Sequence, residues 1–296
     1  MRSVAPFVVL LLLFGCGGPP ENIITGSGVI EGTEIVVSSK ASGQIIEFNV
    51  REGAGVDKDQ ILARVDDEKL QLQKKQLQAG LNEMDFHITS ARAALTAARA
   101  NHSNIEKQAH RIRTLYIKGS STQQQLDNVE TQFKNADTRL TSANNNLHAF
   151  EMKKQQLSVQ LQLIESQISD CLIPSPLAGT VLDKYRQQGE FVATGLPLLS
   201  IADLDHLWIK LYVSESDLGY VNLGAPAEIS IDSYPDLRIK GEIRWISPEA
   251  EFTPHNVQTK EARADLVYAV KIELPNPDGI LKIGMPADIY LNKREN

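Results

Sequence analysis

Few side chains in this sequence have the types and spacing that chemistry requires. The two cysteines, Cys16 and Cys171, lie far apart, the six histidines are scattered, and the four methionines form no local cluster. No HExxH metal motif, phosphate-binding P-loop or GxSxG nucleophile motif occurs. The paired acids Asp66 and Asp67 precede a predicted helix, where N-capping explains them without catalysis. We therefore predict that the chain is not an enzyme and has no catalytic residue, cofactor or metal site.

Cys16 is the residue whose surroundings best fit a covalent modification. Arg2 precedes an apolar run over residues 4–14, which is too short to cross a bilayer as a helix but suits the core of a signal peptide. The Leu-Phe-Gly sequence directly before Cys16 resembles the bacterial lipoprotein cleavage box. We expect residues 1–15 to be removed as a signal peptide and Cys16 to carry lipid. The alternative is ordinary signal-peptide cleavage, with Cys16 lost or unmodified. Lipid on Cys16 would leave Cys171 without a disulfide partner.

Charge and composition exclude two broad classes of protein. The chain has 296 residues, of which 42% are hydrophobic and 23% are charged, and this is too apolar a composition for disorder. Its net charge of −7 argues against a nucleic-acid partner, which would require a basic face. Gln, Asn and Ala are abundant in the middle of the chain, whereas Gly, Pro and Val concentrate towards both ends. This shift indicates a helical insert between β-rich regions.

A heptad repeat dominates residues 68–171. Apolar residues recur there at alternating spacings of three and four, the pattern of a coiled-coil seam. Two polar residues, His102 and Lys154, interrupt the seam, and we interpret His102 as a register-setting group rather than a metal ligand. The seam positions are Leu77, Leu81, Met84, Ile88, Ala91, Leu95, Ala98, His102, Ile105, Ala109, Ile112 and Tyr116, and then Leu126, Val129, Phe133, Ala136, Leu140, Ala143, Leu147, Phe150, Lys154, Leu157, Leu161, Ile164, Ile168 and Cys171.

The seam breaks once, next to Gly119. Glycine is a common helix stop, and Ser121 or Thr122 is suited to cap a following helix. Helices joined by so short a turn are antiparallel neighbours. At 1.5 Å per residue, each arm of about 50 residues reaches roughly 75 Å. Pro174 and Pro176 then return the chain to β-structure.

An internal repeat flanks this predicted α-hairpin. Residues 39–67 align with residues 175–203 at a constant offset of 136 positions and without a gap. The turn glycines coincide, Gly43 with Gly179 and Gly53 with Gly189, and most apolar positions match. One such β-unit buries too little surface to fold alone. We predict that residues 37–67 and 172–203 close on each other into one small β-sandwich. The alternative is two unrelated hairpins that share turn chemistry.

Residues 204–296 alternate apolar and polar positions in several short strands separated by turn signals, which indicates a small β-barrel. Residues 16–36 supply the lipid-anchored linker and an N-terminal strand for this barrel. The predicted fold class is α+β. It is an elongated chain in which a split β-sandwich is interrupted by a long antiparallel coiled-coil α-hairpin and is followed by a β-barrel.

The two half-motifs resemble those of the split biotinyl/lipoyl domain, and the order of all the parts resembles the HlyD-type membrane fusion proteins, or periplasmic adaptors. Two stretches carry this resemblance: Gly43-Gln44-Ile45-Ile46 with Glu52-Gly53-Ala54-Gly55-Val56, and Pro174-Ser175-Pro176-Leu177-Ala178-Gly179-Thr180-Val181. The sequence over residues 247–259 looks closest to adaptors that serve ABC-type exporters. The resemblance covers nearly the whole mature chain.

The resemblance also implies a contact site at the hairpin tip. Adaptors that dock TolC-type channels carry an Arg, a Leu four residues later and a Ser seven further on. This sequence has Arg111, Leu115 and Thr122 at those offsets, with Thr in place of Ser. The alternative is that Leu115 packs, Arg111 is solvated and Thr122 only caps the second helix.

The implied function is that of an adaptor on the periplasmic face of the inner membrane, held by its N-terminal lipid. Its expected partners are an inner-membrane exporter (ABC-type favoured), a TolC-type outer-membrane channel and further copies of itself in a ring. One alternative is a lipoyl- or biotinyl-type carrier subunit of an enzyme complex, which would present a modified lysine between the two halves. Here Lys69, Lys74 and Lys75 look like solvated helix residues. Another alternative is a coiled-coil envelope scaffold.

Overall fold

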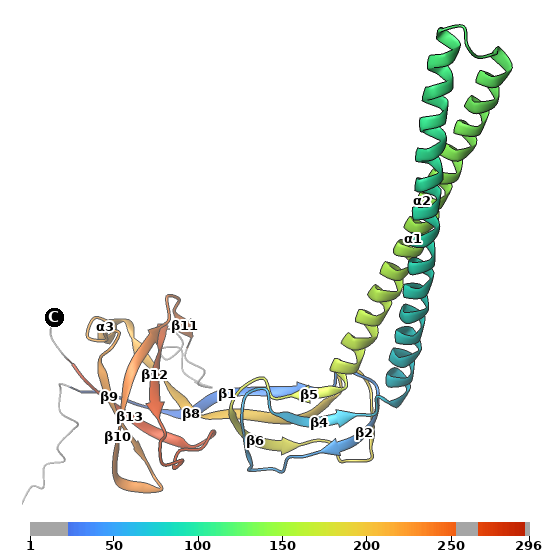
Figure 1. Cartoon of the computed structure of the whole chain (residues 1–296). Coiled ribbons are helices and arrows are strands. Elements are labelled where there is room, and N and C mark those ends of the chain that lie inside the picture. The colour runs from blue at the N-terminus through green and yellow to red at the C-terminus, as the bar shows by residue number, and fades with distance from the viewer. Residues whose placement is uncertain (1–22, 253–265, 294–296) are drawn as a thin grey trace, which may run out of the picture.

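The chain forms three parts in an elongated, bent arrangement (Figure 1). The computed structural model describes residues 23–252 and 266–293. A long α-hairpin stands at one end, a β-sandwich lies in the middle, and a β-barrel forms the other end. The predicted fold class is confirmed. The expected signal peptide and Cys16 lie outside the described residues. So do residues 253–259 of the stretch 247–259 that resembles ABC-type adaptors.

The hairpin consists of α1 (Glu68–Ile117) and α2 (Gln123–Asp170). At 50 residues, α1 is about 75 Å long. The buried side chains of the two helices all belong to the predicted seam: Ile88, Ala91 and Ala109 on α1, and Val129, Ala136 and Leu147 on α2. The two polar seam residues have partners on the opposite helix. Lys154 Nζ lies 2.6 Å from Asp85 Oδ1, and the His102 ring centroid lies 5.1 Å from that of Phe133.

The sandwich is built by strands that pair across the two halves of the repeat. From the first half come β2 (Gly43–Phe48), β3 (Gly55–Val56) and β4 (Ile61–Val65), and from the second come β5 (Leu172–Pro174), β6 (Gly179–Lys184) and β7 (Phe191–Val192). The pairs β2–β7, β3–β6 and β4–β5 each join one half to the other. Equivalent positions of the repeat are buried together in one core: Ile45 and Val181, Val56 and Val192, Leu62 and Leu198, and Val65 and Ile201. Neither half therefore has a complete sheet of its own.

In the described part of the chain, six strands close the barrel in the order β1–β13–β9–β10–β12–β8–β1. They are β1 (Ile23–Ser38), β8 (Pro197–Ser214), β9 (Pro226–Ile231), β10 (Tyr234–Ile246), β12 (Leu266–Pro275) and β13 (Pro286–Asn292), with the short α3 (Glu215–Leu218) and β11 (Glu251–Phe252) at the rim. Fully buried isoleucines fill the interior: Ile30, Ile209, Ile229, Ile272 and Ile289. The expected N-terminal strand is β1.

Two long strands join the barrel to the sandwich. The first residues of β1 pair with β13 in the barrel, and the rest pair with β8 on into the sandwich. The register of β1 against β8 shifts between Gly32 and Thr33, where Gly32 pairs with Leu207 and Thr33 with Asp203. The domain boundary that we predict at residues 203/204 falls inside β8, at this shift.

Candidate functional site at the hairpin tip

The tip is a tight turn whose backbone groups are satisfied locally. Gly119 has a positive φ of 72°, a conformation that glycine adopts without steric cost. Its N–H donates to the Tyr116 carbonyl and the Ser120 N–H donates to the Leu115 carbonyl, both at 2.9 Å. These two bonds form a Schellman motif, which ends α1 and reverses the chain. The turn can therefore present its side chains from a fixed backbone.

Arg111 and Leu115 lie one turn apart on α1 and line the same groove. This groove has a volume of about 630 Å³ and is also lined by Glu106, Lys107, His110 and Thr114. Leu115 is 37% exposed. Within the described residues, the ion pair nearest the tip joins Arg113 to Glu130 at 3.1 Å, and none engages Arg111 or Lys107. The structure thus brings two of the three predicted contact residues together on an open surface.

Thr122 is the N-cap residue of α2, on the other side of the turn. Its Oγ1 accepts a hydrogen bond from the Gln125 backbone N–H at 3.3 Å, and the Gln125 side chain accepts one from the Thr122 N–H at 3.0 Å. This reciprocal pair is a capping box. Thr122 therefore has a local structural role, which the alternative interpretation anticipated, and it does not line the groove of Arg111 and Leu115.

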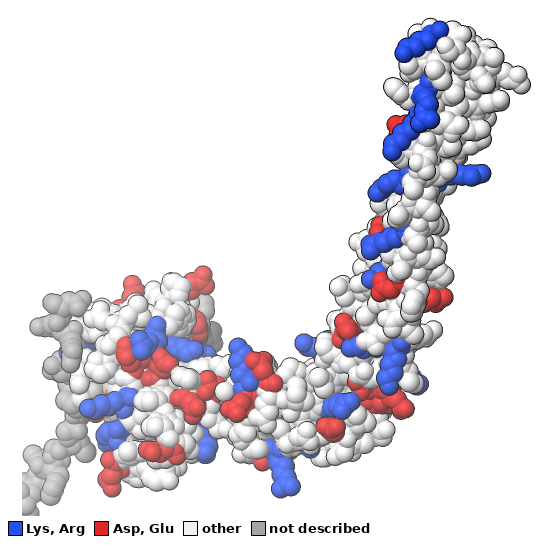
Figure 2. Space-filling view, viewed as in Figure 1, with Lys and Arg blue, Asp and Glu red and all other residues white. Residues whose placement is uncertain are grey.

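Ile117 is a tip residue that the motif comparison missed. It is the last residue of α1 and is 84% exposed, the largest exposed fraction among the large hydrophobic residues of the described chain. An apolar residue next to the turn and outside the seam is the sequence signal that could have found it. Lys118 adds charge beside it, and Figure 2 shows Lys and Arg outnumbering Asp and Glu on the visible face of the distal hairpin. The tip thus combines exposed apolar and basic groups.

The turn glycines of the sandwich fall into two kinds. Gly53 and Gly189 have positive φ values of 77° and 93°, which favour glycine. Gly43 and Gly179 instead sit where the backbone is crowded: a Cβ on Gly43 would lie 2.7 Å from Val65 Cγ1, and one on Gly179 would overlap the Ala202 carbonyl oxygen. The four glycines thus shape the sandwich from which the hairpin projects.

A charged network fixes the hairpin where it leaves the sandwich. Asp67, 7% exposed, accepts hydrogen bonds from Arg64 Nη2 at 3.0 Å and Gln71 Nε2 at 2.7 Å. Burial favours a higher pKa for Asp67, but these hydrogen bonds and the Arg64 charge outweigh it and hold that pKa below its usual value. The expectation that both acids cap α1 needs correction. The Asp66 carboxylate accepts from the Glu68 N–H at 3.0 Å, whereas Asp67 makes no capping bond because Arg64 and Gln71 engage its carboxylate.

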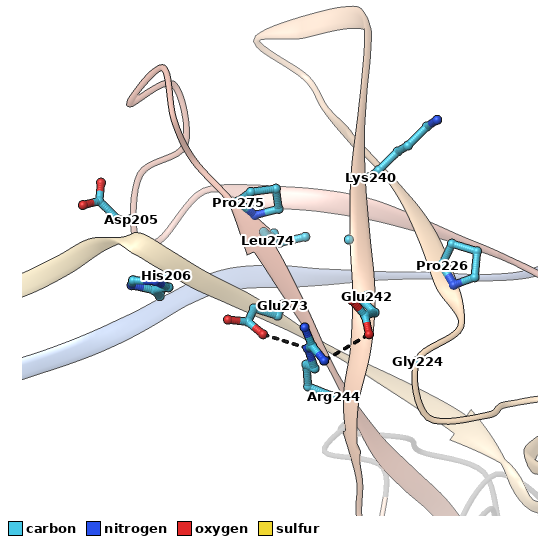
Figure 3. A pocket seen from close by; sticks show the side chains of 11 residues that line it. Asp205, His206, Gly224, Pro226, Lys240, Glu242, Arg244, Glu273, Leu274 and Pro275 are labelled. Atoms are coloured by element: carbon cyan, nitrogen blue, oxygen red, sulfur yellow. Dashed lines mark hydrogen bonds and ion pairs between the residues drawn. The ribbon is translucent and has the colours of Figure 1, made fainter.

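The barrel carries a second groove, of about 540 Å³, at its outer surface (Figure 3). Arg244 lies between two acids there, with 3.1 Å ion pairs to both Glu242 and Glu273. His206 Nδ1 lies 2.9 Å from Asp203 Oδ2, and this hydrogen bond and the Asp203 charge raise the pKa of His206 above its usual 6.5. Because these charges pair with one another, the groove offers few free groups for a ligand.

Within residues 23–252 and 266–293, no three His, Cys, Asp or Glu side chains are grouped so as to hold a metal ion. A helix long and apolar enough to span a membrane is likewise not found among these described residues. Cys171 is buried, and burial raises the pKa of its thiol, as does the nearby Asp67 charge.

Comparison with known families assigns both β-domains. Residues 33–203 match the family described as "RND MFP, barrel-sandwich hybrid domain". Residues 206–295 match the family described as "CusB-like, beta-barrel domain". The match over residues 33–203 covers more than half of the chain and includes the sandwich and the whole hairpin.

Relatives of known sequence match over nearly the whole chain. The "UPF0194 membrane protein in asrC 5'region" of Acidithiobacillus ferridurans is 30% identical, over 94% of this chain and 89% of its own length. A UPF0194 membrane protein of Yersinia pseudotuberculosis (serotype O:3, strain YPIII) is 26% identical, over 92% of this chain and 90% of its own length.

Solved structures share the fold. MacA from Actinobacillus actinomycetemcomitans superposes with a TM-score of 0.60 at 22% identity, over 93% of this chain and 79% of MacA. The membrane fusion protein Spr0693 from Streptococcus pneumoniae R6 superposes with a TM-score of 0.51 at 18% identity, over 92% of this chain and the whole of Spr0693 (100%). At these identities the likeness concerns the arrangement of hairpin, sandwich and barrel.

Proposed function

This chain belongs to the membrane fusion protein family, as its HlyD-type resemblance predicted, and we propose that it is the adaptor subunit of a tripartite export system. In this proposal the barrel end and an N-terminal lipid on Cys16 lie at the inner membrane beside an exporter. The hairpin crosses the periplasm, and its tip meets a TolC-type outer-membrane channel. Further copies form a ring around the conduit. The chain acts as a non-enzymatic connector, and the exporter supplies the energy.

The observation that carries the proposal is the exposed tip at the far end of the hairpin. Arg111, Leu115 and Ile117 are exposed about 65–75 Å along α1 from the sandwich, beside a turn whose backbone needs no partner. Exposed apolar side chains beside unpaired basic groups are suited to a protein partner. The hairpin also occupies the place between the two half-motifs where a lipoyl or biotinyl carrier presents its lysine, and this favours the adaptor over the carrier.

The class of the exporter is a finer point of the proposal. The sequence over residues 247–259 supports an ABC-type exporter, whereas the matched sandwich family bears the RND name. An adaptor of either class would use the same tip. Identification of the inner-membrane partner decides between the two.

The experiment that tests the tip places a photo-cross-linking amino acid at Ile117 of the full-length chain in living cells. The control places it at Ala100, an exposed residue on the shaft of the same helix. We expect a cross-link to an outer-membrane channel from position 117 and none from position 100. Equal labelling of the channel from both positions, or no channel adduct from position 117, would contradict the assigned docking end.

A further inference from the structure

The two sides of the hairpin seam differ in charge. Because the helices are antiparallel, the heptad positions e of both helices lie on one side of the seam, and the positions g lie on the other. The ion pairs that join α1 to α2 in the described structure each use a residue at position e: Lys74–Glu165, Asp85–Lys154, Arg92–Glu151, His102–Asp137 and Arg113–Glu130. The e side is therefore the charged and internally paired side of the hairpin.

The opposite side carries amides in its distal half. Position g and the neighbouring position c place six exposed polar residues there, which we call the amide flank: Asn101, Asn104, Gln108, Gln132, Asn135 and Arg139. Each helix supplies three of them at the same height, because the contacts His102–Asp137 and Arg113–Glu130 set the antiparallel register. From Glu83 at the base of α1 to Asp170 at the end of α2, no residue between these two at position c or g is acidic. The amide flank is thus a surface without carboxylates.

The side chains of the amide flank have no partner within the chain. Among the described residues, no side-chain hydrogen bond or ion pair engages any of the six. Helix stability does not explain them either, because asparagine is a poorer helix former than the alanine, glutamate or lysine that suit exposed helix positions. Three of the six are asparagines, at positions 101, 104 and 135. Their unused donors and acceptors indicate a partner outside the chain.

The chemistry of the amide flank selects the class of partner. Residues 87–114 and 118–151 of the hairpin include no exposed large hydrophobic side chain, whereas protein interfaces are anchored by such side chains. Arg139 alone is too little basic charge for a nucleic acid or an anionic lipid surface, which require several cations. Each amide offers both donors and an acceptor, and an arginine matches a carboxylate. The flank therefore fits a polymer rich in hydroxyl and amide groups with scattered carboxylates.

We propose that the amide flank binds peptidoglycan, whose glycan strands present hydroxyl and acetamido groups and whose peptides present free carboxylates. The amides bond to the glycan, and Arg139 binds a peptide carboxylate. The inference rests on the proposed function, because that function places the hairpin across the periplasm, where the cell wall lies. The lack of acids on the flank fits this partner, since like charges would repel the carboxylates of the wall. The contact holds the distal shaft at the wall and leaves the tip free for the channel.

The test is co-sedimentation of the purified full-length chain with isolated sacculi stripped of bound protein. Arg139→Gln should weaken binding about three- to ten-fold, whereas Arg99→Gln, at nearly the same height on the e side, should change it by less than about two-fold. Asn135→Asp should also weaken binding about three- to ten-fold, whereas Asn145→Asp, at the outward position f of the same helix, should not. All four residues are exposed, so thermal unfolding of each variant should match that of the parent.

Salt provides a second readout. A tenfold rise in salt should weaken binding by less than about five-fold, because bonds to neutral groups dominate the contact. Collapse of binding in salt, or equal losses from both members of each matched pair, would indicate general charge attraction and overturn the proposal. Loss of self-association rather than of sacculus binding in Arg139→Gln would assign the flank to a second copy and overturn it as well. No binding to sacculi, while position 117 still cross-links the channel, would overturn the wall contact but leave the adaptor function standing.

Discussion

Replacing Ile117 by glutamine should separate docking from folding. Full burial of an isoleucine side chain is worth about 1.5–3 kcal/mol. Because 84% of Ile117 is exposed in the free chain, covering it on docking accounts for about 1.3–2.5 kcal/mol, or roughly a 10- to 70-fold change in Kd. The same exposure leaves little packing to lose in the folded chain. We therefore expect the free energy of unfolding to change by no more than about 0.5 kcal/mol.

The assay is binding of the purified chain to the purified channel by biolayer interferometry, with thermal unfolding measured on the same samples. Glutamine keeps good helix propensity, so the last turn of α1 should stay intact. Ala100→Gln, on the exposed shaft, is the matched control and should leave Kd unchanged. A Kd within twofold of the parent for Ile117→Gln, at equal stability, would refute the reasoning that the tip docks through its apolar side chains.

Three further predictions concern the sandwich, the turn and the junction. Gly179→Ala should lower the free energy of unfolding by about 1–3 kcal/mol because the new methyl group overlaps the Ala202 carbonyl oxygen. Gly55→Ala, with open space around it, should cost less than about 1 kcal/mol. Urea unfolding compares the two variants, and equal costs would contradict the packing argument. Thr122→Ala should weaken the start of α2 by about 1 kcal/mol and speed amide exchange at Gln125, because it removes the hydroxyl that accepts from the Gln125 N–H. Ser120→Ala, at an exposed turn residue outside the capping box, should not. Unchanged exchange at Gln125 in Thr122→Ala would refute the capping box. NMR titration should give His206 a pKa above 6.5, and the pKa should fall towards 6.5 in Asp203→Asn. Because the pKa is raised in the folded chain, this pair stabilises the fold fully at lower pH, and the stabilisation is lost as the pH rises through the raised pKa. A pKa unchanged by the substitution would show that Asp203 is not the cause.

The parts of the fold that follow from local periodicity could be predicted. The spacing of seam residues such as Ile88 and Leu147 specifies helices, and Gly119 marks their turn, because both signals act within a few residues of chain. The repeat likewise predicted one shared core, since Leu62 and Leu198 match in sequence and are both fully buried.

What could not be predicted depends on contacts between distant segments. The sequence does not reveal that β2 pairs with β7, or that β1 and β8 run unbroken through both β-domains, because strand pairing has no local signature. The partner of the Asp67 carboxylate could not be predicted either, because its hydrogen bond from Arg64 depends on the angle at which β4 joins α1. At the tip, the family resemblance identified Arg111 and Leu115 as contact residues, whereas the exposure of Ile117 could be seen only in the structure.

The central claim is that this chain connects an exporter to a channel, and recovery of its partners tests it most directly. Mild cross-linking in cells, purification through a C-terminal tag and mass spectrometry of the adducts should recover an inner-membrane exporter together with an outer-membrane channel. An ABC-type permease would support the finer proposal, and an RND-type pump would correct the exporter class alone. Recovery of only self-contacts, or of enzymes unrelated to the envelope, would contradict the adaptor function.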